Sequence, residues 1–305
     1  MNPFLDKVTG PVIPLPTPFK ADHSVDLDAM RSYVNWLIEH GIRNVMTTVG
    51  TSRYNLLTAD EVKQVNEAVV SAADGRAITI VANPPVGGTA QAVDFAQHAE
   101  SIGADLYLCI YPDRNYGEDY IFDFFNTVAQ SVKTGILLHE MPMRNGLGGG
   151  TVQYSLPLLD RLFKVENIVG LKEESLDIGY GNKVVKAISE KAVVIGAGGG
   201  MSRYLRDYWL GAQAFLGGIG NFFPQLELEF FEAMTSRDYD KAFNIVHDIE
   251  APFFSEMISI GWHPGLKGAL AAKGLIPVHE RAPLKEIGEA DMNTIKNLLS
   301  NNGWL

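Results

Sequence analysis

A lysine near the end of an apolar segment carries the strongest chemical signal in the sequence. Residues 168–173 read Ile-Val-Gly-Leu-Lys-Glu, which is typical of a buried parallel strand that ends shortly after Lys172. Burial disfavours an unpaired ammonium, so it lowers the pKa of the amine, and a neutral amine is a nucleophile toward carbonyl groups. Alternation puts Gly170 on the same face, where it would leave room for a substrate. The alternative is a lysine that is solvated or paired with Glu173 or Glu174.

A histidine and an arginine accompany another apolar segment, residues 135–141. His139 lies near the end of this segment, and Arg144 follows it. A histidine can carry protons near neutral pH, and an arginine can bind an anionic substrate. We expect His139 to point toward the Lys172 amine, whereas alternation sends Glu140 to the opposite face of the strand. The alternative is a loop with incidental charges, in which His139 only fills a cavity.

Hydroxyl residues and glycines follow three further apolar segments. Gly50, Thr51 and Ser52 form a turn whose N–H groups and hydroxyls could bind a carboxylate, or simply an ordinary turn with a helix cap. The glycine runs at 196–200, which includes Gly198, and at 217–220 would let the backbone approach a substrate or bind phosphate. No dinucleotide or P-loop motif occurs, and the histidines form no zinc-binding motif, so we predict no cofactor and no metal.

The elements that must position these residues alternate along the chain. Eight strands are expected at residues 12–19, 44–50, 77–83, 105–111, 135–141, 168–173, 192–197 and 212–218. Helices are expected between them, for example at 27–40, 59–72, 90–101, 120–132 and 204–210. Thr58 and Glu61 form a capping-box pattern, and Gly41, Gly75 and Gly103 are placed as helix C-caps.

Eight strands separated by helices predict an α/β fold, specifically a (β/α)8 TIM barrel. A doubly wound open sheet competes, because its parallel strands are also apolar, but the count of eight favours the barrel. The remaining chain reads helical at 226–234, 239–249, 266–273 and 292–300. We therefore expect residues 1–223 to carry the barrel strands and the site, and residues 224–305 to form the eighth barrel helix and a C-terminal helical extension of the same structural unit.

Composition excludes several classes of protein. The 305 residues include 25 Lys plus Arg and 36 Asp plus Glu, a net charge of −11 that argues against a nucleic-acid partner. The single cysteine, Cys109, excludes an internal disulfide and suits a reducing cytoplasm. No window approaches about 18 uninterrupted apolar residues, and the N-terminus has no signal-peptide core, so we expect no membrane partner and a cytoplasmic location.

Taken together, the motifs resemble the dihydrodipicolinate synthase and N-acetylneuraminate lyase family. The resemblance rests on Gly50-Thr-Ser52, Pro142-Met-Arg144-Asn-Gly146 and Gly170-Leu-Lys172-Glu, in this order and spacing. Residues 12–19 and 266–275, with Arg281-Ala-Pro283 after them, are also similar to that family. The resemblance thus covers nearly the whole chain.

The resemblance implies a barrel with a helical extension, a homo-oligomer (dimer or tetramer) and a Schiff-base-forming lyase of the class I aldolase type. Lys172 would form an imine with a small 2-oxo acid, usually pyruvate, or with a sugar acid. Thr51 and Ser52 match the family's hydroxyl pair that binds the pyruvate carboxylate, and Arg144 matches the synthase arginine that meets a second substrate's carboxylate. A protonated imine is an electron sink, so we expect an aldolase or a dehydratase.

The sequence departs from the family at the proton relay. The family usually has tyrosine at the position of His139, and it often has Gly-Glu where this chain has Arg53-Tyr54. The synthases have a tyrosine pair where this chain reads Tyr111-Pro112. Two alternatives therefore stay open: dihydrodipicolinate synthase proper, and a catalytically weak relative that binds a 2-oxo acid without turnover. If His139 does the acid–base work, the rate should depend on pH between about 5 and 8.

Overall fold

Eight parallel strands follow one another in chain order around a closed barrel, which confirms the predicted (β/α)8 class. The computed structural model describes residues 2–112, 116–140 and 153–305. The strands are β1 (Gly10–Pro14), β2 (Asn44–Thr47), β3 (Ile78–Ala82), β4 (Leu106–Ile110), β5 (Gly135–Glu140), β6 (Ile168–Glu173), β7 (Val193–Gly196) and β8 (Ala214–Leu216).

Helices separate the strands and continue beyond the last one. The first eight are α1 (Leu27–Glu39), α2 (Ala59–Ala73), α3 (Thr89–Ser101), α4 (Glu118–Gln130), α5 (Leu156–Leu162), α6 (Ile178–Ile188), α7 (Gly200–Asp207) and α8 (Pro224–Ser236). The predicted C-terminal extension contains α9 (Tyr239–Asn244), α10 (Ala251–Ile260), α11 (Trp262–Ala272) and α12 (Glu289–Asn301). Short helical turns are η1 (Gly50–Ser52), η2 (Tyr54–Leu56), η3 (Tyr208–Leu210), η4 (Ile219–Asn221) and the π-helical η5 (Ile245–Glu250).

The first strand and one helix differ from the sequence prediction. β1 ends at Pro14 rather than continuing to residue 19, because Pro16 and Pro18 also lack the N–H group that a continued ladder requires. The sequence does not predict α10, since Pro252 reads as a helix breaker. Pro252 lies in the first turn of α10, directly after the π-helical η5.

The predicted helix-end signals are confirmed. Glu61 N donates to Thr58 Oγ1 at 3.2 Å, and Thr58 N donates to the Glu61 carboxylate at 2.9 Å, which completes the capping box. Gly41, Gly75 and Gly103 have φ values of 95°, 68° and 78°. These left-handed conformations are the ones that a glycine C-cap supplies without strain.

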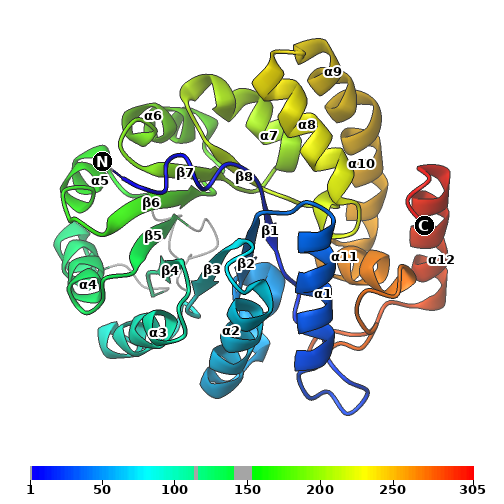
Figure 1. Ribbon diagram of the computed structural model, residues 1–305, viewed down its shortest axis with the longest axis horizontal. Coiled ribbons are helices and arrows are strands. Elements are labelled where there is room, and N and C mark those ends of the chain that lie inside the picture. Colours follow the sequence, from blue (N-terminus) through cyan, green and yellow to red (C-terminus); the bar gives the residue numbers. More distant parts are fainter. Residues whose placement is uncertain (1, 113–115, 141–152) are drawn as a thin grey trace. The chain divides into compact units, whose positions relative to one another are not determined.

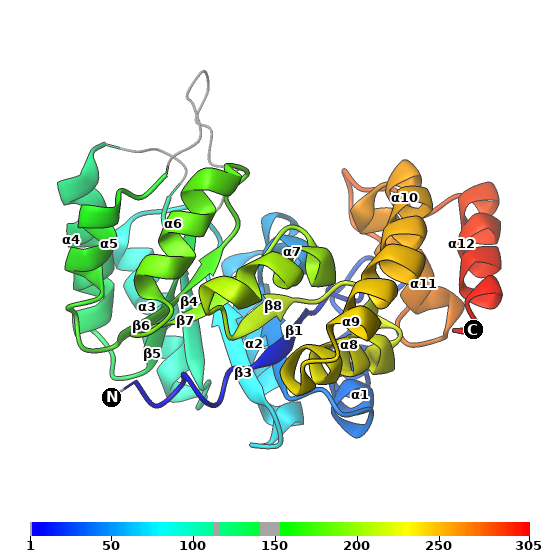
Figure 2. The ribbon, with the colours of Figure 1, turned by 90° about the horizontal axis from the view of Figure 1, so that it is seen from above.

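The chain folds into two compact units. The first unit contains Met1–Val12 and Ile78–Leu216, and the second contains Ile13–Ala77 and Gly217–Leu305. In the first unit, α3 to α6 lie outside the neighbouring strands β4, β5 and β6 (Figure 1). In the second unit, α10, α11 and α12 are neighbours in both views (Figures 1 and 2). The predicted boundary at residue 223 stays a prediction.

The two strands that carry His139 and Lys172 are buried throughout. Every residue of β5 and β6 is buried, as is every residue of the neighbouring β4, so polar side chains on these strands must find partners inside the protein. Among the helices of the described ranges, none is both long and apolar enough to cross a membrane.

Glu227 of α8 explains the glycine run that follows β8. The Gly218 N–H donates to Glu227 Oε1 at 2.7 Å. A Cβ atom on Gly217 or Gly220 would lie 2.2 or 2.4 Å from Glu227 Oε2, so both glycines make room for this carboxyl group. Burial raises the pKa of Glu227 to about 7, although the backbone donors favour its charged form.

We expect the free energy of unfolding to depend on pH through the protonation of Glu227. The pKa of Glu227 is higher in the folded state, at about 7, than the 4.5 of an unperturbed glutamate. The protonated Glu227 therefore makes its full contribution to the free energy of unfolding below the pKa of the unfolded state. This contribution is lost as pH rises through the pKa of the folded state. Relative to Glu227→Gln, the wild-type free energy of unfolding should fall by on the order of 2 kcal/mol between about pH 5 and pH 7.5.

Urea denaturation at both pH values measures this difference. The matched control is Glu232→Gln, an exposed carboxylate on the same helix, which should leave the wild-type pH dependence unchanged. Equal pH slopes for wild type and Glu227→Gln would contradict the prediction.

Candidate active site

Strand register brings Lys172 and His139 together. The pairing of β5 with β6 shifts by one residue after Ile136, so that Leu137 pairs with Gly170 and His139 pairs with Lys172. Side chains at paired positions of parallel strands point to the same face. Lys172 Nζ consequently lies 2.8 Å from His139 Nε2. The structure thus brings together the two residues that the sequence predicts on one face.

A third group, the carboxylate of Glu174, contacts both of these side chains. Its Oε2 atom touches Lys172 Nζ and lies 2.9 Å from His139 Nε2. The side chains of His139 and Lys172 are 2% and 3% exposed, whereas that of Glu174 is 27% exposed. We call Lys172, His139 and Glu174 the lysine triad.

The sequence prediction gave Glu174 no catalytic role and named it only as a possible partner of Lys172. The structure does pair Lys172 with Glu174, and the Lys172 side chain is buried at the same time. Strand alternation is the sequence signal that could have predicted the position of Glu174, because a residue two positions after Lys172 in a strand lies on the same face. The strand ends at Glu173, however, so alternation alone does not fix the direction of the Glu174 side chain.

Burial and neighbouring charges set the pKa values of the triad. Burial lowers the pKa of Lys172, and Glu174 opposes this shift without cancelling it. Burial alone would raise the pKa of Glu174, but the Lys172 ammonium and the His139 hydrogen bond hold it at about 2. Glu174 is therefore a carboxylate at neutral pH, and the Lys172 ammonium loses its proton more readily than an exposed lysine does.

Two nearby carboxylates have other partners. Glu140 accepts the N–H of Tyr154 at 2.8 Å and the hydroxyl of Tyr180 at 2.7 Å, which agrees with its predicted position on the opposite face. Glu173 contacts the guanidinium of Arg203. Neither carboxylate is the partner of Lys172.

Arg203 joins the ends of β6 and β7 in a buried ion-pair cluster. Besides contacting Glu173, it donates from Nε to Asp207 Oδ2 at 2.9 Å and from Nη1 to the Ala197 carbonyl. Its two carboxylate partners have fully buried side chains. The charge of Arg203 also contributes to the lowered pKa of Lys172.

Gly170 and Gly198, the two glycines of the first unit that were predicted for the site, differ in the space around them. A Cβ atom on Gly170 would lie 2.6 Å from Leu137 Cδ2 and 2.7 Å from the Val193 carbonyl oxygen, so side chains and backbone of β5 and β7 fill this space. Gly198 has a φ of 75°, and a Cβ atom there would lie 3.5 Å from Glu174 Cγ. Gly198 therefore lies beside the triad, and a substrate contact at either glycine stays a prediction.

The predicted carboxylate clamp lies in the second unit, where Gly50, Thr51 and Ser52 form the η1 turn. The Thr17 hydroxyl donates to the Ser52 carbonyl at 2.5 Å, which anchors the turn. Ser52 Oγ is buried and has no hydrogen-bond partner among the residues that the structure describes. An unpaired buried hydroxyl is destabilising unless a ligand or water satisfies it.

Arg53 holds the same turn from the other side. It adopts a left-handed backbone conformation with a φ of 61°, and its Nη1 donates to the Thr51 carbonyl at 2.6 Å. Its Nη2 donates to Glu280 Oε1 at 2.6 Å and to the His263 carbonyl at 3.1 Å. The ion pair with Glu280 is almost completely buried. We call Arg53, Glu280 and His263 the Arg53 network.

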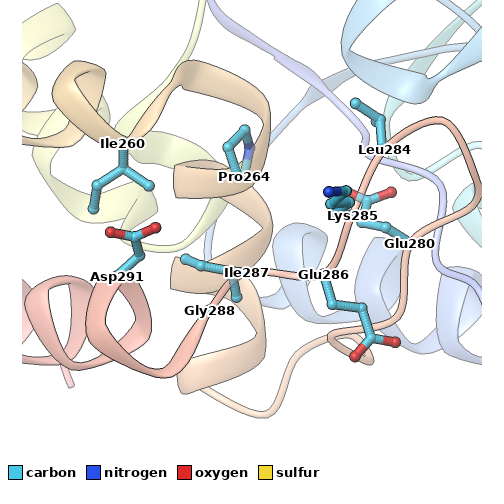
Figure 3. A pocket seen from close by; sticks show the side chains of 9 residues that line it. All are labelled: Ile260, Pro264, Glu280, Leu284, Lys285, Glu286, Ile287, Gly288 and Asp291. Carbon is cyan, nitrogen blue, oxygen red and sulfur yellow. The ribbon is translucent and has the colours of Figure 1, made fainter.

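Glu280 also borders a small pocket of the second unit that no sequence motif indicates. The pocket has a volume of about 240 Å³. Figure 3 shows its lining, which comes from the ends of α10 and α11, the loop before α12, and α12 itself. The lining residues are Ile260, Pro264, Glu280, Leu284, Lys285, Glu286, Ile287, Gly288 and Asp291.

Arg144, the last predicted site residue, lies outside the described residues. Within the described ranges, no group of three or more His, Cys, Asp or Glu residues is placed to hold a metal ion.

Comparison with known proteins decides the family. The sequence matches the Dihydrodipicolinate synthetase family over residues 7–302. The chain belongs to this family. The 4-hydroxy-tetrahydrodipicolinate synthase of Methylobacterium radiotolerans is 27% identical over 300 residues, which cover 98% of this chain and 97% of that protein. The synthase of Aquifex aeolicus is 28% identical over 298 residues, with 95% and 96% covered.

Solved structures of family members share the fold. The crystal structure of dihydrodipicolinate synthase from Aquifex aeolicus has a TM-score of 0.82 at 27% identity and covers 97% of this chain and 98% of that chain. N-acetylneuraminate lyase from Fusobacterium nucleatum has a TM-score of 0.86 at 20% identity, with 96% and 98% covered. Since proteins with two different activities share this fold, the fold alone does not select a substrate.

We expect Glu280→Gln to lower the free energy of unfolding by about 3 kcal/mol, because it leaves the buried Arg53 guanidinium without its countercharge. Chemical denaturation measures the loss. Glu229→Gln is the matched control, since Glu229 pairs with Lys241 at 2.8 Å on the surface with both side chains nearly half exposed. That change should cost less than about 1 kcal/mol. Similar small losses in both variants would show that the buried pair contributes little.

Proposed function

We propose that this protein is a Schiff-base-forming lyase of the class I aldolase type, in which Lys172 attacks the carbonyl carbon of a 2-oxo acid such as pyruvate. The observation that carries this proposal is the buried Lys172 amine, which has a lowered pKa and contacts both His139 and Glu174. Membership of the dihydrodipicolinate synthetase family supports it.

The reaction begins when Lys172 loses a proton and its electron pair attacks the carbonyl carbon. The carbonyl oxygen leaves as water, and the product is a protonated imine on Nζ. This imine accepts the electron pair of a carbon–carbon or carbon–oxygen bond two atoms away, which breaks or, in reverse, forms. His139 Nε2 lies 2.8 Å from Nζ. In the tautomer that carries its hydrogen on Nδ1, Nε2 accepts the proton that the amine must lose and returns it later in the cycle.

The carboxylate of the 2-oxo acid is bound by Thr51 and Ser52 in this proposal. The Ser52 hydroxyl, which has no hydrogen-bond partner among the described residues, and the anchored η1 turn support this assignment. Gly50 and Gly198 are the proposed backbone contacts of the substrate. Gly170 was predicted as a third, although Leu137 and Val193 fill the space beside it. Arg144 is the proposed partner of a second carboxylate, on the strength of the family resemblance alone.

Dihydrodipicolinate synthase proper is the second candidate, because similar curated proteins such as those of Methylobacterium radiotolerans and Aquifex aeolicus carry the name 4-hydroxy-tetrahydrodipicolinate synthase. His139 argues against it, since the family usually has a tyrosine there. A screen of 2-oxo acids and aldehydes for pyruvate release or consumption separates a lyase, a synthase and a relative that only binds. A dimeric or tetrameric assembly and a cytoplasmic location remain further proposals.

We expect pyruvate plus borohydride to add mass only to the peptide that carries Lys172, and Lys172→Ala to abolish the addition. Lys267 is an internal control, because burial lowers its pKa to about 8, but its Nζ contacts the Thr17 carbonyl at 3.2 Å rather than an acid–base pair. Peptide mass mapping distinguishes the two lysines. Labelling of Lys267, or of no lysine, would overturn the proposed mechanism.

We expect Ser52→Ala and Thr51→Val each to weaken pyruvate binding by about 1–3 kcal/mol, the scale for leaving a polar partner unsatisfied. The pyruvate concentration that gives half-maximal trapping measures this effect. Thr235→Val is the control, because that exposed threonine bonds only within its own helix. Unchanged half-maximal concentrations in both clamp variants would remove the clamp from the mechanism.

A further inference from the structure

The carboxylate of Glu174 touches the nitrogen atom on which the imine would form. Its Oε2 contacts Lys172 Nζ and also lies 2.9 Å from His139 Nε2. Lys172 is 3% exposed, so water cannot surround a positive charge at Nζ. The neighbours of Nζ must supply the compensation that water would otherwise give.

Within the part of the chain that the structure describes, the other charged groups near Nζ do not supply this compensation. His139, from β5, is neutral or positive. Arg203, from α7, is positive and is engaged with the carboxylates of Glu173 and Asp207. Gly198, which packs beside Glu174 from the segment between β7 and α7, carries no charge. Among the described residues, Glu174 is thus the carboxylate in contact with Nζ.

We infer that Glu174 is a catalytic residue, the counter-ion that keeps the Lys172 imine protonated during turnover. The inference rests on the proposed function, because it requires an imine at Lys172. A protonated imine draws electrons from the substrate, whereas a neutral imine does so poorly. A buried protonated imine without a countercharge would lose its proton, since burial disfavours the charged form.

The proton balance of imine formation is compatible with this role. The Lys172 ammonium carries three hydrogens, of which one stays on the imine nitrogen and two leave with the carbonyl oxygen as water. The sum is ammonium plus carbonyl giving protonated imine plus water. The charge on Nζ is the same before and after this step, so the Glu174 carboxylate pairs with a cation in both states.

Glu174 also connects the buried pair to solvent. It is the most exposed member of the triad, at 27% against 2% for His139 and 3% for Lys172. The two hydrogens that leave Nζ pass to the atoms that contact it, His139 Nε2 and Glu174 Oε2, and then to the departing oxygen. The acid–base work that the family usually gives to a tyrosine is therefore divided here between a histidine and a carboxylate.

The test is the pH dependence of trapping by cyanoborohydride, which reduces the protonated imine. Wild type, Glu174→Gln, Glu174→Ala and Glu174→Asp are incubated with pyruvate across a pH series, and the labelled fraction at Lys172 is read by mass spectrometry. In the two neutral variants the pH of half-maximal trapping should fall by about 1–3 units, the range for loss of an adjacent opposite charge. Glu174→Asp should recover part of this shift, because it keeps the charge.

Two controls make the result specific to charge at the imine. Glu190→Gln removes an exposed carboxylate elsewhere in the first unit, and it should leave the trapping profile unchanged. His139→Gln should slow the approach to the trapped state but leave its pH midpoint within about half a unit of wild type. Circular dichroism identifies any variant that does not fold, and the two neutral variants provide independent comparisons.

The outcomes distinguish the inference from the proposed function. Trapping in wild type with an unchanged pH midpoint in Glu174→Gln or Glu174→Ala overturns the counter-ion and leaves the lyase proposal intact. An equal downward shift in Glu174→Asp and Glu174→Gln also overturns it, because then the charge does not matter. Absence of trapping in wild type with any 2-oxo acid overturns the proposed function, and the counter-ion with it.

Discussion

The one-residue register shift between β5 and β6 is the constraint on which the lysine triad depends. Ile136 pairs with Ile168, whereas Leu137 already pairs with Gly170, so β6 contains one residue more than β5 at this point. Without the shift, His139 would pair with Leu171, and the amine of Lys172 would turn away from the imidazole. Asn2 supports the extra residue, because its side-chain amide donates to the Val169 carbonyl at 2.6 Å. Backbone hydrogen bonding between β5 and β6 thus determines whether the side chains of the lysine triad can meet.

Both compact units contain a buried ion pair at or beside residues that were predicted for the site. In the first unit the buried Lys172 cation faces Glu174, and in the second the buried Arg53 cation faces Glu280. The surroundings give the two pairs different consequences. Glu174 is partly exposed and also bonds a histidine, so protons can move through it. The pair of Arg53 with Glu280 is almost completely buried, and Arg53 also bonds the Thr51 carbonyl, so this pair fixes the shape of a turn.

The sequence predicts much of the fold, because strand and helix periodicity are local properties of the chain. The bounds of β6 agree with the expected residues 168–173. The contact between His139 and Lys172 was predicted from strand alternation together with the family resemblance. Glu174 was missed because it lies beyond the end of the strand, where alternation no longer fixes a direction. The Arg53 network was missed because Arg53 and Glu280 are 227 positions apart, and no local pattern encodes such a contact. β1 was expected too long because its prolines interrupt hydrogen bonding without interrupting the apolar pattern.

The left-handed backbone of Arg53 bears on how this chain could have diverged from its relatives. The family often has glycine at this position, and glycine adopts a φ of 61° without strain, whereas arginine does not. A reversion to glycine would relieve the backbone but leave the Glu280 carboxylate buried without its cation. An arginine at position 53 without the Glu280 carboxylate would be equally unfavourable, because its buried guanidinium would lack a countercharge. Replacing either residue alone would therefore leave the other buried without its countercharge, so a change at position 53 is tolerated only together with a change at position 280.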